Sequence, residues 1–373
     1  MDLEADRRQE PRLRYAFIGS AATIVSLHLK ALAQLPADIV GMADVDAERG
    51  AARASEVGCP FFAAHRPMLD KVRPDVVVIT TPHPFHPALA IDAFAAGAHV
   101  LVEKPMAIDV AAADQMIDAA KQAQRLLAVN FQQRFRPDIE RAKTLIEAGA
   151  IGPLVRVLCV EPWYRSAAYY RSAAWRGKWK TEGGGVLMNQ APHTLDLLCY
   201  LVGMPAKVWG WTRTLEHAIE CEDTAQAMLE YPNGAPGYFT ASTVEAGSKR
   251  RLHIVGDCGS IELTGDQLTV TTFTPSLKEF LVSTPELFAE PDNSRETMTL
   301  PGDGGGHLAV HRDLYRSIIE GHSPRCDGRQ GLMSLELANA IVLSSYTERP
   351  VTLPLDRSAY ADLLADLQAG RRR

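Results

Sequence analysis

Short apolar runs alternate with amphipathic stretches through the first third of the chain, and this alternation limits the possible folds more than any other feature. The predicted strands are 13–18, 38–42, 75–80, 98–102 and 126–130, and the predicted helices are 24–35, 46–57, 87–96 and 109–124. Apolar strands separated by helices are typical of a parallel, doubly wound α/β sheet. Ligands bind such sheets at the carboxyl ends of the strands, so functional residues are expected there.

The rhythm changes near residue 135. A helix is predicted at 137–148 and two late helices at 307–320 and 332–347. The strands between them alternate polar and apolar residues and are predicted at 155–163, 206–213, 225–231, 237–242, 251–255 and 260–263. This pattern predicts an α+β domain whose sheet is mostly antiparallel and has one open face. We therefore divide the chain into a disordered tail at 1–11, an α/β domain at 12–134 and a second domain at 135–373.

Composition excludes several classes of function. A chain of 373 residues is too long for one compact core, and its net charge of −6 argues against nucleic-acid binding. No apolar run reaches the roughly 18 residues that span a membrane, and the N-terminus lacks the apolar core of a signal peptide. Six scattered cysteines without a C-x-x-C pair indicate reduced thiols, so a cytoplasmic protein is expected.

The first strand ends at Gly19, and a helix begins about five residues later. In a dinucleotide-binding fold this turn directs backbone N–H groups at the pyrophosphate, although only the first glycine of G-x-G-x-x-G is present and a plain tight turn fits nearly as well. Asp44 ends the second strand, where an acid suits the adenosine ribose and repels a 2′-phosphate. NAD is therefore favoured over NADP. Asp44 could instead cap the next helix, a role for which Asp46 competes.

A segment rich in proline and histidine, residues 81–87, follows the strand at 75–80. His83 and His86 are three residues apart, as in some metal sites. Three prolines keep the segment extended, however, and no carboxylate or thiol cluster accompanies the histidines. We predict no metal here and expect a loop that lines the cofactor.

Glu103-Lys104-Pro105 follows the apolar run 98–102. A lysine at the carboxyl end of a buried strand lies near dry protein, where its charge is costly unless it is paired. Lys104, held by Glu103 and directed by Pro105, is a catalytic candidate. A structural ion pair explains the same residues equally well.

Five segments together resemble the Gfo/Idh/MocA oxidoreductases, which are named for glucose-fructose oxidoreductase and inositol dehydrogenase. They are 17–19, 43–46, 80–82, 97–105 and 183–196, and the resemblance covers roughly residues 12–350. It implies a Rossmann domain that binds a nicotinamide cofactor, and an open-faced domain that carries substrate and makes subunit contacts. The cofactor-binding residues it implies are Gly19, Ser20, Ala22, Thr23, Ile24, Asp44, Thr81, Pro82, His86, Glu103 and Lys104.

The chain departs from the family pattern at two places. The phosphate turn lacks the later glycines and is one residue longer before His28, which is similar to the Gly-Ala-Ala turn of the family's nucleotide-sugar uronate dehydrogenases. Binding is expected to survive because backbone N–H groups contact the phosphates. Asn189 stands where many members have an aspartate, so a proton relay through that position is absent.

Three glycines, 183–185, precede a predicted helix at 186–201. On it Asn189 and His193 share a face, and Asp196 can hold the His193 ring. Taken alone, His193 is typical of a histidine packed inside a helical domain, but its match to the family motif favours a catalytic role. A histidine suits the role of base for a substrate hydroxyl, Lys104 can stabilise the developing alkoxide, and Asn189 can orient a neighbouring hydroxyl.

Residues 161–182 combine aromatic and basic side chains, with five basic and two acidic residues. Aromatic rings can cover the C–H faces of a sugar and arginines can bind hydroxyls or an anionic group, so we predict substrate contacts from Trp163, Arg165, Tyr170 and Trp175. A subunit interface favours the same residue types, and both roles can hold. Later in the chain, His307 is a possible substrate-edge residue and His311 a packing residue, with no third metal ligand evident.

These observations predict an NAD-dependent oxidoreductase that moves a hydride between nicotinamide and a secondary alcohol of a sugar, cyclitol or glycoside. The alternative is a redox-neutral NAD-dependent glycosidase, which oxidises C3 transiently, eliminates the aglycone, adds water and reduces the product, with acidic glycosides favoured by the basic segment. A non-enzymatic sugar or NAD sensor is the third hypothesis. The expected partners are a small carbohydrate and further copies of the chain, as a homodimer or homotetramer.

Overall fold

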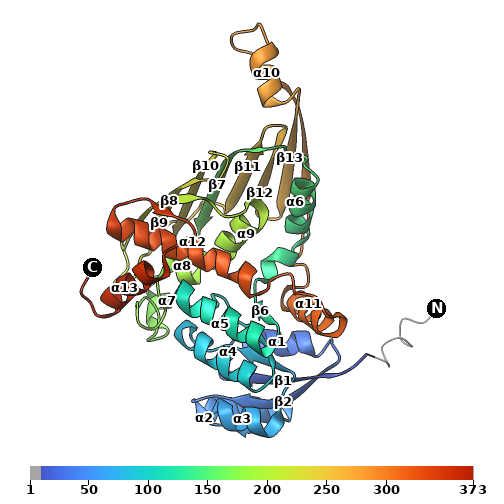
Figure 1. Cartoon of the computed structure of the whole chain (residues 1–373), viewed down its shortest axis with the longest axis vertical. Coiled ribbons are helices and arrows are strands. Elements are labelled where there is room, and N and C mark those ends of the chain that lie inside the picture. Colours follow the sequence, from blue (N-terminus) through green and yellow to red (C-terminus); the bar gives the residue numbers. More distant parts are fainter. Residues whose placement is uncertain (1–9, 373) are drawn as a thin grey trace, which may run out of the picture. The chain divides into compact units, whose positions relative to one another are not determined.

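The computed structural model describes residues 10–372, which form two compact units (Figure 1). The first unit runs to Gln132 and includes a return segment, Gly305–Leu332; the second comprises Gln133–Gly304 and the chain from Met333. The break at 132/133 lies close to the predicted one, but the second domain is not the contiguous block predicted at 135–373. The return segment contains α11 (Gly306–Glu320), which packs against α1 (Val25–Leu32).

The predicted tail, residues 1–11, falls mostly outside the described residues. Pro11 is described, and its carbonyl accepts a hydrogen bond of 2.9 Å from the Tyr315 hydroxyl in α11. None of the described helices has the length and apolar character needed to cross a bilayer.

A six-stranded parallel sheet forms the centre of the first unit, in the order β3-β2-β1-β4-β5-β6. Its strands are β1 (Leu13–Ile18), β2 (Ala37–Ala43), β3 (Phe61–Phe62), β4 (Val76–Ile79), β5 (His99–Val102) and β6 (Leu127–Val129). The remaining helices of this unit are α2 (Ala47–Val57), α3 (His65–Val72), η2 (His83–Phe85), α4 (His86–Ala95) and α5 (Val110–Ala123), with η3 (Gln132–Phe135) at the boundary. This confirms the predicted doubly wound fold; the short β3 and α3 were not predicted.

The register brings the carboxyl ends of four strands to one edge. Ile18 of β1 pairs with Ala43 of β2 and with Ile79 of β4, and Ile79 pairs with Val102 of β5. The residues that follow these strand ends are therefore neighbours.

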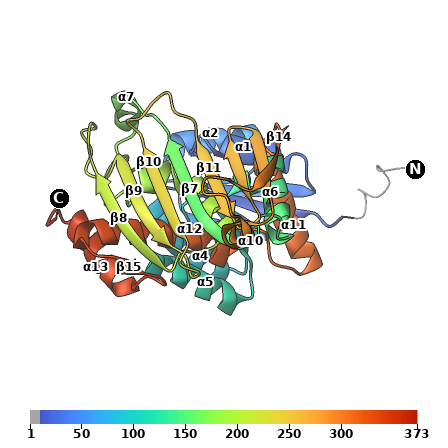
Figure 2. The same cartoon turned by 90° about the horizontal axis from the view of Figure 1, so that it is seen from above.

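The second unit is built on a nine-stranded sheet in the order β14-β13-β12-β11-β7-β10-β9-β8-β15 (Figure 2). The strands are β7 (Leu154–Pro162), β8 (Lys207–Arg213), β9 (Thr224–Glu230), β10 (Pro236–Ser242), β11 (Arg251–Gly256), β12 (Gly259–Thr264), β13 (Gln267–Thr274), β14 (Asp292–Thr299) and β15 (Val351–Thr352). The sheet is mostly antiparallel, as predicted, but β7 and β10 pair in parallel. β13, β14 and β15 were not predicted.

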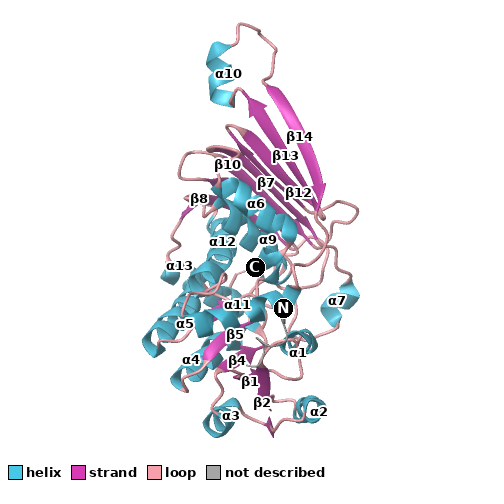
Figure 3. Ribbon diagram, turned by 90° about the vertical axis from the view of Figure 1, so that its right-hand side faces the viewer, coloured by secondary structure: helices cyan, strands magenta, loops and turns pink. Residues whose placement is uncertain are grey.

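Helices cover one face of this sheet. The helices of this unit are α6 (Pro137–Glu147), α7 (Ala167–Arg171), α8 (Val186–Asn189), α9 (Pro192–Val202), α10 (Leu277–Ser283), α12 (Gly328–Thr347, which begins in the first unit) and α13 (Arg357–Gln368), of which α10 projects from the end of the sheet instead. α6 contacts β13 and α9 contacts β7, and Figure 3 shows both helices on the same side of the strands.

The other face is open and partly apolar. Trp209 of β8 pairs with Met228 of β9, which pairs with Tyr238 of β10, so the three side chains form a row across the sheet. Each is at least 39% exposed, whereas Val208 and Leu229, one residue away, are buried. The alternation expected for a half-covered sheet is therefore present.

Candidate active site

The β1–α1 turn packs directly on the end of β4. Gly19 has a φ of +94°, and a Cβ atom there would lie 2.8 Å from the carbonyl carbon of Thr80 and the nitrogen of Thr81. Only glycine fits both the backbone conformation and this approach. The next residue, Ser20, is fully buried. A narrow turn of this kind suits a pyrophosphate that is bound by backbone N–H groups, and α1 begins at Val25, close to the predicted position.

Asp44 lies beside this turn. Its carboxylate accepts N–H groups from Ala21 at 2.7 Å and from Asp46 at 2.8 Å. The side chain of Asp46 caps α2 by accepting the N–H of Arg49 at 3.0 Å. The structure thus assigns the capping role to Asp46 and leaves Asp44 at the turn, where an NAD ribose would bind in a Rossmann fold.

His86 joins two loops at the carboxyl edge of the sheet. Its ring is fully buried, and its nitrogens lie 2.7 Å from the Thr81 carbonyl oxygen and 3.0 Å from that of Pro105. Burial lowers the pKa of His86, against the opposing effect of these two contacts. The ring therefore connects the loop after β4 to the Glu103-Lys104-Pro105 segment.

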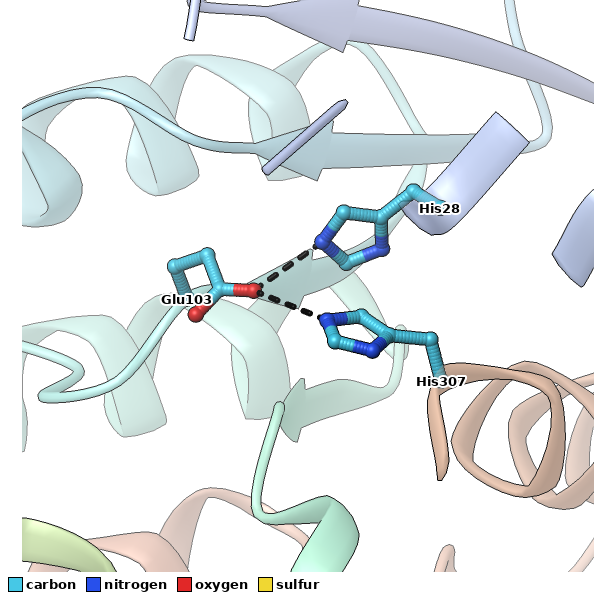
Figure 4. A group of neighbouring side chains, drawn as sticks. All are labelled: His28, Glu103 and His307. Carbon is cyan, nitrogen blue, oxygen red and sulfur yellow. Dashed lines mark hydrogen bonds and ion pairs between the residues drawn. The ribbon is translucent and has the colours of Figure 1, made fainter. Parts of the chain in front are cut away.

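Glu103 is the centre of a polar cluster (Figure 4). Its Oε1 lies 3.0 Å from Nε2 of His28 and accepts the Asn130 amide at 2.6 Å, and its Oε2 accepts the backbone N–H of Lys104 at 3.2 Å. His307 Nε2 lies 3.9 Å from Oε1. Burial favours the protonated form of Glu103, but the hydrogen bond from His28 and the charges of His28, His307 and Lys104 outweigh it and lower the pKa to about 2.

A second buried histidine extends the cluster. His28 Nδ1 lies 2.9 Å from Nε2 of His311, and burial lowers the pKa of His311 far below its usual value. One of the two rings donates to the other across this contact, while Nε2 of His28 faces Glu103. His311, predicted as a packing residue, is thus also a hydrogen-bond partner. His307 lies at Glu103, and its predicted substrate-edge role stays a prediction.

The ligand atoms of His28, Glu103 and His307 lie within 4.8 Å of one another, a spacing that a metal ion could bridge. Glu103 Oε1, however, already accepts hydrogen bonds from His28 and Asn130. An ion would replace the hydrogen bond between His28 and Glu103 and would compete with the Asn130 amide for the same oxygen, and these hydrogen bonds account for the cluster without one.

The predicted single helix at 186–201 is wrong, because it is broken into α8 and α9. Pro192 lacks a backbone N–H and begins α9 at its first position. Asn189 therefore ends one helix and His193 lies in the first turn of the next. Asn189 donates its side-chain amide to Glu182, whose other oxygen accepts the N–H of Gly177.

Asp196 is held by Arg134, and its predicted contact with the His193 ring stays a prediction. The guanidinium donates to both carboxylate oxygens, at 2.6 and 2.9 Å, and both side chains are almost completely buried. Next to His193, the Thr194 hydroxyl donates to Glu161, which also binds Arg250 at 2.7 Å. His193 thus lies on a helix that is anchored by two buried carboxylates.

Glu222 binds the backbone at the end of the triple-glycine segment. It is buried, and its Oε1 accepts the N–H groups of Gly185 and Leu187 at 2.9 and 3.0 Å. Burial raises its pKa to about 7, with backbone hydrogen bonds opposing the shift and the nearby charge of Glu182 adding to it.

The aromatic rings and cations of residues 163–180 stack on one another. Arg165 lies over Trp163 and Tyr169, and Arg176 lies over Tyr169 and Trp175, with distances of 4.2–5.2 Å to the ring centroids. Tyr170 instead bonds Thr243 at 3.0 Å. Much of this segment therefore stabilises itself, and the predicted sugar contacts of Trp163, Arg165, Tyr170 and Trp175 stay predictions.

The residues that hold the candidate active site in place were not predicted from the sequence. Asn130 carried a usable signal, because it ends a predicted strand at the functional edge. Arg134, Glu182 and Glu222 carried none, since each contacts a segment distant in the sequence or joined to it by a turn.

Comparison with known families identifies the class of protein to which the chain belongs. Residues 13–131 match the model "Oxidoreductase family, NAD-binding Rossmann fold", and residues 139–262 match the "GFO/IDH/MocA C-terminal domain". The protein is therefore an oxidoreductase with an NAD-binding Rossmann domain. More specifically, the chain belongs to the Gfo/Idh/MocA family, which confirms the resemblance seen in the sequence.

The similarity to several known proteins extends over nearly the whole chain. The WlbA dehydrogenase of Bordetella pertussis, solved with NADH and UDP-GlcNAcA, is 32% identical with a TM-score of 0.79, covering 93% of this chain and 100% of that chain. Levoglucosan dehydrogenase, solved with NADH, is 25% identical with a TM-score of 0.81 over 93% and 100%. D-glucoside 3-dehydrogenase of Escherichia coli (strain K12) is 29% identical over 369 residues, 91% of this chain and 97% of that protein.

Proposed function

We propose that the protein is an NAD-dependent dehydrogenase acting on a secondary alcohol of a sugar, cyclitol or glycoside. The observation that carries this proposal is Lys104 at the carboxyl edge of an NAD-binding sheet, with its backbone N–H bound by Glu103 at 3.2 Å. The carbohydrate class is supported by the similarity to levoglucosan and D-glucoside dehydrogenases along most of the chain.

The proposed cofactor contacts follow the strand ends. They are Gly19, Ser20, Ala22, Thr23 and Ile24 at the pyrophosphate, Asp44 at the ribose, and Thr81, Pro82, Glu103 and Lys104 toward the nicotinamide. His86 acts by holding the loops of Thr81 and Pro105 together. The packed Gly19 turn and the carboxylate beside it fit NAD.

NAD, when bound, exchanges a hydride with the alcohol carbon. The hydroxyl proton is handled by the protein: His193 takes it as the carbonyl forms, and Lys104 donates a hydrogen bond to the same oxygen and stabilises its developing charge. Asn189, oriented through its amide by Glu182, binds a neighbouring hydroxyl. In the reverse direction His193 returns the proton to the oxygen.

The test is a panel of sugars, cyclitols and glycosides, acidic ones included, with NADH absorbance and aglycone release recorded together. We expect NADH to form in proportion to substrate. Lys104→Met and His193→Gln should each lower kcat by at least about a hundredfold, while the affinity for NADH, measured by fluorescence, changes much less. Aglycone release without lasting NADH would instead identify the redox-neutral glycosidase, and silence in both channels would contradict the proposed substrate class.

The double variant tests whether the two residues act on one proton. If they do, Lys104→Met combined with His193→Gln costs little more than the worse single change, because residues that act as a unit are not additive. Fully multiplicative losses would contradict a shared step.

We also propose that the open sheet face makes a homodimer or part of a homotetramer. The exposed row Trp209, Met228 and Tyr238 offers the apolar, aromatic surface that subunit interfaces favour.

A further inference from the structure

A protruding arm extends from the end of the second unit's sheet. It comprises residues 277–291: α10 and the loop that follows it, between the paired strands β13 and β14 (Figures 1 and 3). Its base is anchored, because the backbone N–H groups of Leu277 and Lys278 donate to the carbonyl and carboxylate of Asp257, at 2.8 and 2.9 Å. Ser276 caps α10 by accepting the N–H of Glu279. The base of the arm is therefore held in place by hydrogen bonds to the rest of the second unit.

The tip of the arm is strongly apolar and almost fully exposed. Leu281, Val282, Leu287 and Phe288 are 79%, 82%, 88% and 94% exposed. Four large apolar side chains on one short segment form a patch of the kind that marks a contact site. The arm also carries exposed acids, Glu279, Glu286 and Glu290, against the single base Lys278, so its net charge is −2.

A surface of opposite character exists on the same chain. Residues 163–180, which we name the aromatic–basic segment, contain five basic residues and no acid. Arg171, Lys178 and Lys180 are exposed, and so is the ring of Tyr164, at 55%. Aromatic rings suit apolar side chains, and the lysines and arginine suit the glutamates of the arm.

The arm cannot reach this segment within one chain. α10 and α7, which lies in the aromatic–basic segment, are at opposite ends of the second unit in both views (Figures 1 and 3). We propose that the arm docks on the aromatic–basic segment of a second copy of this chain. The occupant is a second copy because charge and apolar character complement each other on these two surfaces.

Docking would place Leu287 and Phe288 of one copy against a segment that, under the proposed function, contacts substrate in the other. This consequence rests on the proposed function, whereas the association itself does not. Association is measured without substrate, so failure of one proposal is distinguishable from failure of the other.

The first experiment compares the molar mass of the full chain by light scattering across a concentration series. Leu287→Ser combined with Phe288→Ser should raise the dissociation constant by at least about tenfold. Both side chains are exposed, so the variant is expected to fold, which circular dichroism checks. Val45→Ser is the matched control, because Val45 is 97% exposed on the first unit. An unchanged dissociation constant in the arm variant would overturn the proposal.

The second experiment identifies the receiving surface. E286K/E290K changes the net charge of the arm from −2 to +2, and R171E/K178E/K180E changes that of the aromatic–basic segment from +5 to −1. Each variant alone should associate weakly, because its own arm and segment then repel. An equimolar mixture should regain association, since every arm then meets a segment of opposite charge. A mixture that associates no better than its components would show that the arm docks elsewhere and would overturn the assignment.

Discussion

Glu103 gathers hydrogen bonds from three places in the chain: His28 in α1, Asn130 after β6 and the backbone of Lys104. The carboxylate thereby fixes the backbone that carries the candidate catalytic lysine. His28 is fixed in turn by His311. The position of Lys104 thus depends on side chains that do not themselves need to touch substrate.

Asp44 tests the choice of cofactor at the scale of one residue. Asp44→Ser should raise KM for NAD by at least about tenfold and lower the preference for NAD over NADP, because it removes both the acceptor for the ribose and the charge that repels a 2′-phosphate. Steady-state kinetics with both cofactors measure this. Asp44→Asn is the control for charge, because its amide oxygen can still accept the N–H of Ala21. Unchanged cofactor preference in both variants would contradict the assignment.

Glu222 makes stability depend on pH. Its pKa is about 7 in the folded chain against 4.5 for an ordinary glutamate, so the unfolded chain loses this proton first as pH rises. The free energy of unfolding therefore falls between about pH 4.5 and 7, by at most roughly 3 kcal/mol.

Glu222→Gln keeps an oxygen for Gly185 and Leu187 but cannot ionise. The variant should match the wild type at pH 5 and exceed it in stability at pH 8, as measured by urea unfolding. Glu220→Gln, at an exposed neighbouring position, should show no such gain. Equal pH dependence in wild type and Glu222→Gln would contradict the raised pKa.

At the scale of elements, the Arg134–Asp196 ion pair joins η3 to α9, the helix that carries His193. Arg134→Met leaves a buried carboxylate without its partner and should lower the free energy of unfolding by about 3–5 kcal/mol. The double variant Arg134→Met/Asp196→Leu should recover much of this loss, because no buried charge remains. If the double variant were as unstable as the single one, the loss would come from packing alone.

The break between α8 and α9 shows where local patterns were insufficient. The apolar residues from 186 to 201 fit one helix, and Pro192 was the available sign of an interruption. Proline is tolerated in the first turn of a helix, so its presence marked a new start. Asn189 and His193 consequently belong to different elements, with Glu182 orienting the first and α9 positioning the second.

For the whole molecule, the open face of the nine-stranded sheet predicts self-association. Trp209→Glu combined with Tyr238→Glu should lower the molar mass measured by light scattering, because charge is placed on the proposed interface. Gln34→Glu combined with Gln122→Glu, at two exposed positions of the first unit, is the control for added charge. A mass equal to that of the wild type in the double variant would exclude this face as the interface.

Local sequence patterns were enough to predict the doubly wound sheet, the mostly antiparallel second sheet, the glycine turn and the lysine at the strand end. These features depend on the periodicity of neighbouring residues and on backbone preferences, which are local. Long-range packing, in contrast, returns Gly305–Leu332 to the first unit and places His307 beside Glu103 and His311 beside His28. The same packing brings Asn189, Gly185 and Arg134 to the carboxylates that bind them. Such partners are far apart in the sequence or separated by turns, so their contacts depend on how complete elements pack.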